Sequence, residues 1–378
     1  MVRSFEPLIR SNHAKLSLIY SGNMKSIADL EQWLAECDAE LEQGHATGEI
    51  WQQRSFCLAQ LGRYPEAILS FQQALSLDPD NPKVWCNYAS TLAATRQLAD
   101  AVHAYDRALD LAPDYANVWR RRGKVLYHQK EYVRAIESYD HALVLEPTDA
   151  RVWYGKGLAS YQLGQIQQSI EYFKVAIAND PNTPEAYISL AHALIDNNQK
   201  SQALAYLQPW ITKGWQDARL LQCYAYLLDQ RHDHEEALHS LEEACALDPR
   251  NVDLWFHRGI MLTRLKRLPE AHVAFREMLK CRADRTDGWL ALGLVLRHLS
   301  EPEAAIAAFD KALALSPSHP LAFFHQASCY ALLGRDDWAE EHLRRALSLD
   351  TQTYLLKAQQ DPALQGLETR LLPAAKTG

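Results

Sequence analysis

Tryptophan recurs at a fixed interval along this chain, and the interval restricts the possible folds more than any other feature of the sequence. Trp51, Trp85, Trp119 and Trp153 are each separated by 34 residues. Continued steps of 34 reach five more bulky apolar residues, which are Tyr187, Leu221, Trp255, Trp289 and Phe323. Because no insertion or deletion interrupts the series, the sequence predicts nine tandem copies of one supersecondary unit.

Two further columns repeat with the same period and indicate what each unit is. The residue four positions after each bulky residue is small in all nine units (Ser55, Ala89, Gly123, Gly157, Ala191, Ala225, Gly259, Gly293 and Ala327). The residue twenty positions after it is aromatic or leucine (Phe71, Tyr105, Tyr139, Phe173, Leu207, Leu241, Phe275, Phe309 and Leu343). Spacings of three and four residues place such side chains on one face of a helix. Each unit is therefore predicted to be a pair of helices, which the small residues allow to approach closely.

A proline ends the second helix of most units, as at Pro79 and Pro113. One helix pair cannot bury its own apolar face, so neighbouring pairs must stack. We therefore expect an all-α solenoid, with repeats over residues 48–81, 82–115, 116–149, 150–183, 184–217, 218–251, 252–285, 286–319 and 320–353.

This order of large, small, aromatic and proline columns resembles the tetratricopeptide repeat family over about four fifths of the chain. The resemblance implies a right-handed superhelix whose concave surface is lined by the first helix of each repeat. It also implies that the chain binds a protein or peptide segment in that groove.

The segments outside the repeats are expected to cover the two ends of the stack. Within residues 1–47, the amphipathic stretch Ser26–Gln43 predicts a capping helix over the first repeat. Within residues 354–378, the stretch Tyr354–Leu372 predicts a second cap that is broken near Asp361–Pro362.

The fifth repeat departs from the pattern in its second helix. Pro209 falls inside the expected helix, which should therefore end at Gln208. Trp210 and Trp215 stand where most repeats have alanine and proline, so they should separate their neighbours or lie on the surface. We expect an altered superhelical twist over residues 184–217. It is either a hinge or partner contact, or a divergence that a solenoid tolerates.

Helical geometry assigns the inner surface of the groove. At about 100° per residue, positions −2, +1, +2, +5, +8 and +9 from the bulky residue point away from the packed side of the first helix. In repeats two to four these inner-face positions are basic and aromatic, namely Lys83, Asn87, Asn117, Arg120, Arg121, Lys124, Tyr127, His128, Arg151, Tyr154 and Tyr161. Such a set favours a carboxylate, a phosphate or an acidic peptide segment. The alternative is an ordinary solvated face of charged residues.

Some tetratricopeptide co-chaperones hold a C-terminal carboxylate with lysine and asparagine in one repeat, asparagine in the next, and lysine and arginine in the third. Aligned on repeats one to three, only Asn87 and Arg121 of this chain match that set. Gln52, Phe56 and Asn117 occupy the other positions. An acidic or C-terminal segment therefore fits as a partner, but a chaperone tail is not expected.

In repeats seven to nine the inner-face positions are apolar instead. They are Phe256, Ile260, Leu290, Leu294 and Phe324, edged by Asp253 and Asp287. An exposed apolar wall is typical of a contact surface for an amphipathic helix or an apolar peptide. Alternatively, neighbouring helices or the chain's own tail bury these side chains, which is the interpretation we favour for Leu290 and Leu294.

Composition narrows the class of partner and the compartment. The chain has 39 Lys and Arg against 47 Asp and Glu, a net charge of −8, which disfavours nonspecific binding to nucleic acid. Its seven cysteines form no CxxC pattern and are expected to be reduced thiols. No apolar run approaches the ~20 residues of a membrane span, so we expect a cytoplasmic location without membrane insertion.

Catalysis is not expected, because the repeats and caps occupy the chain and it contains no common phosphate-loop, hydrolase or metalloprotease motif. His232–Asp233–His234 lies in a turn without further fixed metal ligands, and Cys281 is expected to be incidental, so no metal or cofactor is expected. The leading hypothesis is an interaction scaffold or assembly factor. The alternatives are a metal- or small-ligand-delivering protein and, less favoured, an RNA-binding helical repeat.

Overall fold

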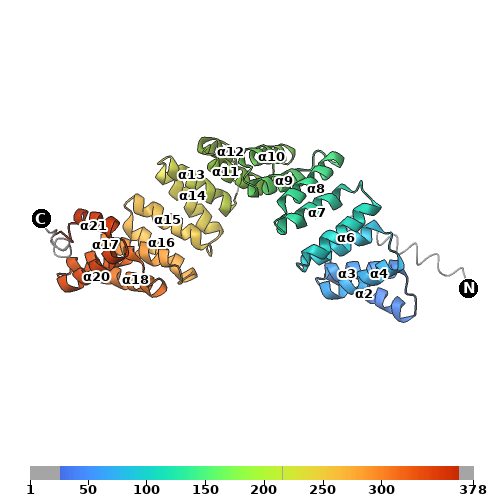
Figure 1. Cartoon of the computed structure of the whole chain (residues 1–378), viewed down its shortest axis with the longest axis horizontal. Coiled ribbons are helices and arrows are strands. Elements are labelled where there is room, and N and C mark those ends of the chain that lie inside the picture. The colour runs from blue at the N-terminus through green and yellow to red at the C-terminus, as the bar shows by residue number, and fades with distance from the viewer. Residues whose placement is uncertain (1–25, 215, 366–378) are drawn as a thin grey trace, which may run out of the picture. The chain divides into compact units, whose positions relative to one another are not determined.

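The computed structural model describes residues 26–214 and 216–365, and this part of the chain is all-α (Figure 1). It contains twenty helices and no strand. The all-α repeat fold expected from the sequence is therefore confirmed. None of the described helices combines the length and the apolarity that crossing a bilayer requires.

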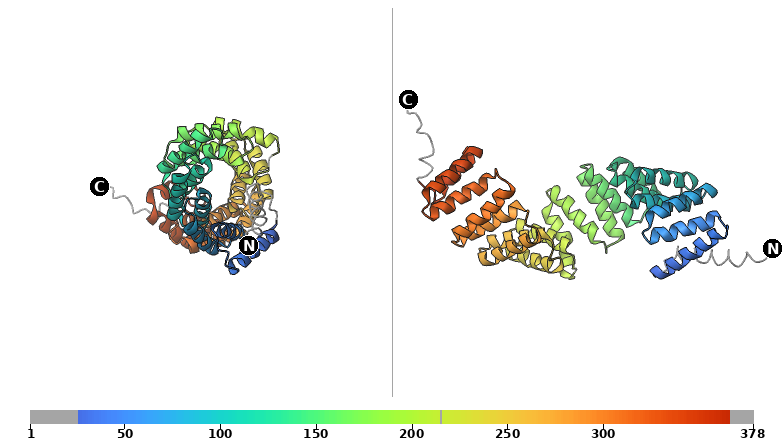
Figure 2. Two further views of the ribbon diagram at one scale, coloured as in Figure 1. Left: turned by 90° about the vertical axis from the view of Figure 1, so that its right-hand side faces the viewer. Right: turned by 90° about the horizontal axis from the view of Figure 1, so that it is seen from below.

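The chain divides into two compact units, which meet between Asn197 and Asn198. Unit 1 contains the helices α2 Ile27–Glu42, α3 Gly48–Gln60, α4 Tyr64–Leu77, α5 Pro82–Ala94, α6 Leu98–Leu111, α7 Ala116–His128, α8 Tyr132–Leu145, α9 Ala150–Gln162, α10 Ile166–Asn179 and α11 Pro184–Asp196. Within this unit the helices stack in chain order, from blue to green in Figure 2.

Unit 2 continues the same pattern. It contains α12 Lys200–Thr212, α13 Ala218–Gln230, α14 His234–Leu247, α15 Val252–Arg264, α16 Leu268–Cys281, α17 Thr286–His298, α18 Pro302–Leu315, α19 Pro320–Leu332, α20 Asp336–Leu349 and α21 Thr351–Gln360. Helices α3 to α20 alternate between first and second helices along the chain, and within each unit the two helices of a repeat pack against each other. The two helices of the fifth expected repeat, α11 and α12, belong to different units.

In each repeat the turn between the two helices requires a residue with positive φ. That residue lies eleven positions after the bulky residue and is glycine at Gly62, Gly164 and Gly334. The other six turns place Arg96, Lys130, Asn198, His232, Lys266 and Ser300 at φ values between 58° and 66°. Because this conformation costs a non-glycine residue roughly 1 kcal/mol, the packing of the two helices must impose it.

Within a repeat, the ring of the second helix packs directly on the small residue of the first. A Cβ atom built on Gly157 would lie 2.6 Å from Cε1 of Phe173, and one built on Gly259 would lie 2.6 Å from Cε1 of Phe275. Both rings are almost fully buried. At these positions the absence of a side chain is what brings the two helices together.

Between repeats, the indole groups of the tryptophans donate hydrogen bonds to the backbone just after the preceding repeat's second helix. The indole Nε1 of Trp85 donates to the carbonyl oxygen of Pro79 at 2.8 Å, and Trp153 donates to Pro147 at the same distance. Trp119, Trp255 and Trp289 make the equivalent bond, six residues back along the chain. The proline column therefore supplies the acceptor for four of these tryptophans as well as ending a helix, and Ala283 takes the same position for Trp289.

A basic residue three positions after the tryptophan joins three helices. The guanidinium of Arg122 lies 5.8 Å from the Trp119 ring centroid. Its Nε donates to Asp106 of the preceding repeat at 2.6 Å, and its Nη1 donates to Ser138 at 2.6 Å. Arg54, Lys156 and Arg258 repeat the cation–π contact and the link to an acid sixteen residues earlier. These contacts lie on the packed side of the repeats, away from the inner face.

Helices also lie in the two segments outside the repeats. Helix α2 begins after Ser26, whose side chain accepts from the Asp29 amide, and it buries Trp33 against the core of the first repeat. Helix α21 ends at Gln360, next to the expected break at Asp361–Pro362. Leu367 and Leu371, which belong to the expected second cap, lie outside the described residues.

The expectation for the second helix of repeat five is wrong. Helix α12 continues through Pro209 to Thr212 rather than ending at Gln208. Pro209 and Ala205, whose carbonyl loses its helical donor, are both exposed, so water can satisfy that carbonyl. Trp210 is buried rather than displaced to the surface. Trp215 lies outside the described residues, and the altered twist stays a prediction.

We predict that Gly157→Val destabilises the chain by about 1–3 kcal/mol, because the new side chain overlaps the buried Phe173 ring. Urea denaturation followed by circular dichroism measures the effect. Ala307→Val is the matched control, since Ala307 is exposed on α18 and should change stability by about 0.5 kcal/mol or less. Equal midpoints for the two variants would contradict the close ring contact.

Candidate functional site

The inner-face positions of unit 1 line a pocket of about 530 Å³. Four of the residues expected to bind a partner meet there: Lys83 and Asn87 from α5, and Asn117 and Arg121 from α7. We call this the unit 1 pocket. Its walls also include residues that the sequence analysis did not select, namely Phe56, Tyr64, Ser90, Thr91 and Tyr115. Phe56 and Ser90 occupy inner-face positions, so the same geometry could have identified them.

In the unit 1 pocket, the hydrogen-bond partners of Arg121 are neutral. Its Nη1 donates to Ser90 Oγ at 2.8 Å, and its Nε donates to Asn117 Oδ1 at 3.4 Å. The Ser90 hydroxyl also lies 2.9 Å from the hydroxyl of Tyr105. Among the described residues, no carboxylate lies within 4 Å of the Arg121 guanidinium. Neutral partners hold this side chain in place without neutralising it.

Arg120 and Arg151 have a different environment, because they share one carboxylate. Arg151 donates to both oxygens of Asp149, at 3.0 and 2.7 Å, and Arg120 Nε lies 3.8 Å from Asp149 Oδ2. Burial by itself would raise the pKa of Asp149, but the hydrogen bonds and positive charge of the two arginines outweigh it and lower that pKa. Burial and the neighbouring Arg151 also lower the pKa of Arg120. These two cations therefore form a structural ion cluster.

The other predicted residues of the basic set lie outside the unit 1 pocket. Lys124 and His128 are exposed on α7, and Lys124 makes no ion pair with the described residues. The Tyr127 ring centroid lies 5.5 Å from that of Tyr132. The Tyr154 hydroxyl lies 3.2 Å from Ser189 Oγ, and Tyr161 donates to Asp196. The Tyr127 contact lies within the third repeat, whereas those of Tyr154 and Tyr161 connect the fourth repeat to the fifth.

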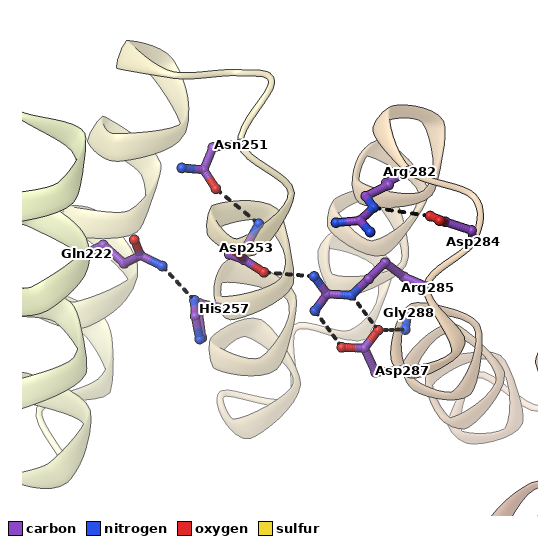
Figure 3. Close-up of polar contacts among 9 residues, drawn as sticks. All are labelled: Gln222, Asn251, Asp253, His257, Arg282, Asp284, Arg285, Asp287 and Gly288. Carbon is purple, nitrogen blue, oxygen red and sulfur yellow. Dashed lines mark hydrogen bonds and ion pairs between the residues drawn. The ribbon is translucent and has the colours of Figure 1, made fainter. Parts of the chain in front are cut away.

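In unit 2 the acids expected at the edge of the apolar wall are joined by an arginine that the sequence analysis missed. Arg285 donates to Asp253 at 2.9 Å and to both oxygens of Asp287, at 2.9 and 2.6 Å (Figure 3). Hydrogen bonds from Arg285 lower the pKa of Asp287. His257 lies beside this cluster, 3.2 Å from Gln222. The two carboxylates are therefore neutralised within the chain.

The apolar residues of unit 2 do not form one exposed wall. Phe256, Ile260 and Leu294 are partly exposed, but Leu290 is buried and Phe324 is only 3% exposed. The Phe324 ring packs against Tyr354 of α21, with ring centroids 5.6 Å apart. Leu290 is therefore buried, as favoured for it in the sequence analysis, and the expectation that Phe324 lies exposed on an open wall is wrong, because Tyr354 covers it.

The histidine turn and Cys281 show no built site. Nδ1 of His234 lies 3.2 Å from Asp229 Oδ1, and Arg264 pairs with the same carboxylate. Over residues 26–214 and 216–365, no group of three or more metal-ligating side chains is placed to hold an ion. Cys281 is exposed, with its Sγ 3.9 Å from the Pro249 carbonyl oxygen.

Comparison with protein families matches most of the repeat region. A tetratricopeptide repeat family matches residues 58–125 and 160–222. A TPR repeat family matches residues 123–164, and a further tetratricopeptide repeat family matches residues 225–287 and 290–352. These matches follow one another across both units.

Individual relatives are more distant. The chain is 30% identical over 115 residues to protein O-mannosyl-transferase TMTC3 of Homo sapiens, covering 30% of this chain and 13% of that protein. It is 30% identical over 95 residues to tetratricopeptide repeat protein 7A of Homo sapiens, covering 25% and 11%. The chain thus spans a small part of the length of either relative. The structure of PilF from Pseudomonas aeruginosa is 24% identical with a TM-score of 0.47, covering 55% of this chain and 94% of that one.

We predict that Asp149→Asn lowers the free energy of unfolding at pH 7 by about 1 kcal/mol, because it removes the ion pair with Arg151. The loss stays small because Arg151 is exposed and solvent screens the pair. Asparagine also caps helices well, so the loss of stability measures the contribution of the Asp149 charge. The pKa of Asp149 is lowered in the folded state, so its contribution is present above about pH 4 and disappears as the pH falls through the folded pKa.

Urea titrations at pH 7 and at pH 3 measure this difference. The gap between wild type and Asp149→Asn should close at the lower pH. Asp114→Asn is the control, because Asp114 is exposed and its carboxylate has no partner among the described residues. A gap that persists unchanged at pH 3 would show that the loss does not come from the carboxylate charge.

Proposed function

Because the chain belongs to the tetratricopeptide repeat family, we propose that it is an interaction scaffold or assembly factor that holds an acidic segment of another protein in its groove. The unit 1 pocket is the centre of the proposed site. Its volume of about 530 Å³ suits a few residues of an extended segment, and it lies among the inner-face positions of three consecutive repeats.

The single observation that carries the proposal is the environment of Arg121. The neutral Ser90 and Asn117 fix its guanidinium at the pocket wall, so little conformational entropy is lost when a ligand binds. An aspartate, a glutamate or a terminal carboxylate could supply the missing negative charge by a bidentate hydrogen bond. The nearby Arg120 cannot take this role equally well, because it shares Asp149 with Arg151.

Neighbouring side chains add specificity to a charged contact. Asn87 lines the pocket, and its side-chain amide makes no hydrogen bond with the described residues. An amide can donate to and accept from the backbone of a bound segment. Phe56 and Tyr115 provide apolar and aromatic surface on the same pocket. We therefore favour a peptide segment over a bare anion as the ligand.

The cytoplasm is the compartment that we propose for this activity. All seven cysteines are free thiols, and six of them are buried. A reducing compartment keeps such thiols unpaired, whereas an oxidising one favours disulfides.

Pull-down from a lysate of the source organism, with mass spectrometry of the retained proteins, tests the proposal. We expect Arg121→Glu to reduce retention of the specific partners by at least about tenfold, because it places a negative charge against an acidic segment. Retention should also weaken as salt is added, since the contact is electrostatic. Acidic segments should be common to the lost partners.

Arg107→Glu is the matched control for this experiment. Arg107 is exposed on α6 and, among the residues that the structure describes, forms an ion pair only with Asp110, at 3.3 Å. The Arg107→Glu variant should retain the same partners as wild type. Circular dichroism should show equal helix content for Arg107→Glu and Arg121→Glu. Retention of every partner by Arg121→Glu at the wild-type level would reject the unit 1 pocket as the binding site.

A further inference from the structure

The chain's own C-terminal segment lies on the inner face of repeats eight and nine. Arg297, Phe324 and Ser328 occupy inner-face positions there, at +8, +1 and +5 from their bulky residues. Each of them contacts the segment from Tyr354 to Leu364, which follows the last repeat. In unit 2 this segment takes the place that a partner would occupy in the groove.

A carboxylate anchors the segment to two repeats. Arg297 Nη2 donates to Asp361 Oδ2 at 2.6 Å, and Ser328 Oγ donates to the same oxygen at 2.8 Å. The Asp361 side chain is 7% exposed and that of Arg297 is 19% exposed. His325 Nδ1 lies 3.2 Å from Arg297 Nη1, and burial and the arginine charge lower the pKa of His325 to about 3. The neutral imidazole therefore accepts from Arg297, which keeps its charge for the carboxylate.

Apolar contacts hold the rest of the segment. The ring of Tyr354 packs on Phe324, and Ala358 and Leu364 are fully buried in the same cluster. By contrast, Phe256 occupies the same +1 position two repeats earlier and remains partly exposed. The segment thus converts an inner face into a small core. Its recognition elements are an aromatic residue, a carboxylate seven residues later and a leucine three residues after that.

The segment does not simply continue the repeat. Four residues separate α18 from α19, whereas Asp350 alone separates α20 from α21 and serves as the cap of both helices. Because the connection is short, α21 follows a path different from the one that the first helix of a tenth repeat would take. Asp361 consequently reaches Arg297 of α17, which lies 64 residues away in the chain; α21 and α17 are drawn in red and orange-red in Figure 1.

We propose that the inner face of repeats eight and nine is a second binding site, and that residues 354–364 fill it as an internal competitor. The partner it fits is a protein segment that presents an aromatic residue and a carboxylate with the spacing of Tyr354 and Asp361. This site is separate from the unit 1 pocket and does not depend on the function proposed for it. A tethered segment competes at an effective concentration of order millimolar, so the partner must bind more tightly than the segment or be locally abundant.

A labelled synthetic peptide of residues 351–365 tests the proposal against the full-length chain. Fluorescence anisotropy measures its affinity for wild type and for Asp361→Asn. Removing the buried charge weakens the internal segment and leaves Arg297 without its partner. We expect the peptide to bind Asp361→Asn about tenfold more tightly than wild type. A peptide in which aspartate 361 is replaced by asparagine should lose that gain.

Two further variants keep the result interpretable. Asp337→Asn is the matched control, because Asp337 is exposed on α20 without a partner among the described residues, and it should bind the peptide as wild type does. Tyr354→Ala removes the ring contact of the internal segment with Phe324 and leaves the residues of the site unchanged, so it should also raise the affinity for the peptide. It serves as the main comparison if circular dichroism shows that Asp361→Asn has lost helix.

Equal peptide affinity for wild type, Asp361→Asn and Tyr354→Ala, or no binding to any of them at millimolar peptide, would overturn the proposal. Arg121→Glu distinguishes this site from the unit 1 pocket. It should bind the peptide as wild type does, even where it loses the partners of the first site. Loss of peptide binding in Arg121→Glu would place the peptide in the unit 1 pocket and also overturn the second site.

Discussion

The contact of one large apolar side chain, a ring in most repeats and a leucine in the others, with one small residue determines the geometry of each repeat. Gly293 allows the Phe309 ring so close that a Cβ atom there would lie 2.5 Å from it. The same contact occurs at Gly123, Gly157 and Gly259, and it sets how closely the two helices of these repeats approach. This approach fixes which side of the first helix is buried and which side faces inward. The position of Arg121 in its pocket, and of Phe324 beneath Tyr354, follows from it.

Much of this arrangement could be predicted from the sequence, because the repeating columns contain the packing information. The alternation of first and second helices along the chain, and the meeting of Lys83, Asn87, Asn117 and Arg121 in one pocket, follow from the period and the helical angle. The path of α12 through Pro209 could not be predicted, because the exposure of its neighbours decides whether proline is tolerated. The positive φ of residues such as Lys130 could not be predicted either, because helix packing imposes it against the preference of a non-glycine residue.

The candidate sites were harder to predict than the fold, because charge compensation depends on residues far apart in the chain. Arg120 and Arg121 are adjacent in sequence, yet one approaches Asp149 and the other contacts Ser90, 31 residues earlier. In unit 2, Arg285 bridges two acids that belong to successive repeats. A charged inner face therefore presents to a partner only the charge that the chain does not neutralise itself.

The distribution of the cysteines gives the chain a built-in attachment point for probes. In the described part of the chain, Cys281 is exposed while the other six thiols are buried. Burial raises the pKa of Cys57 and of Cys223 to about 12, so their thiolates are scarce at neutral pH. A maleimide dye should therefore label the native protein at one place, the end of the second helix of repeat seven. Slow labelling of the remaining thiols would then time the transient opening of individual repeats.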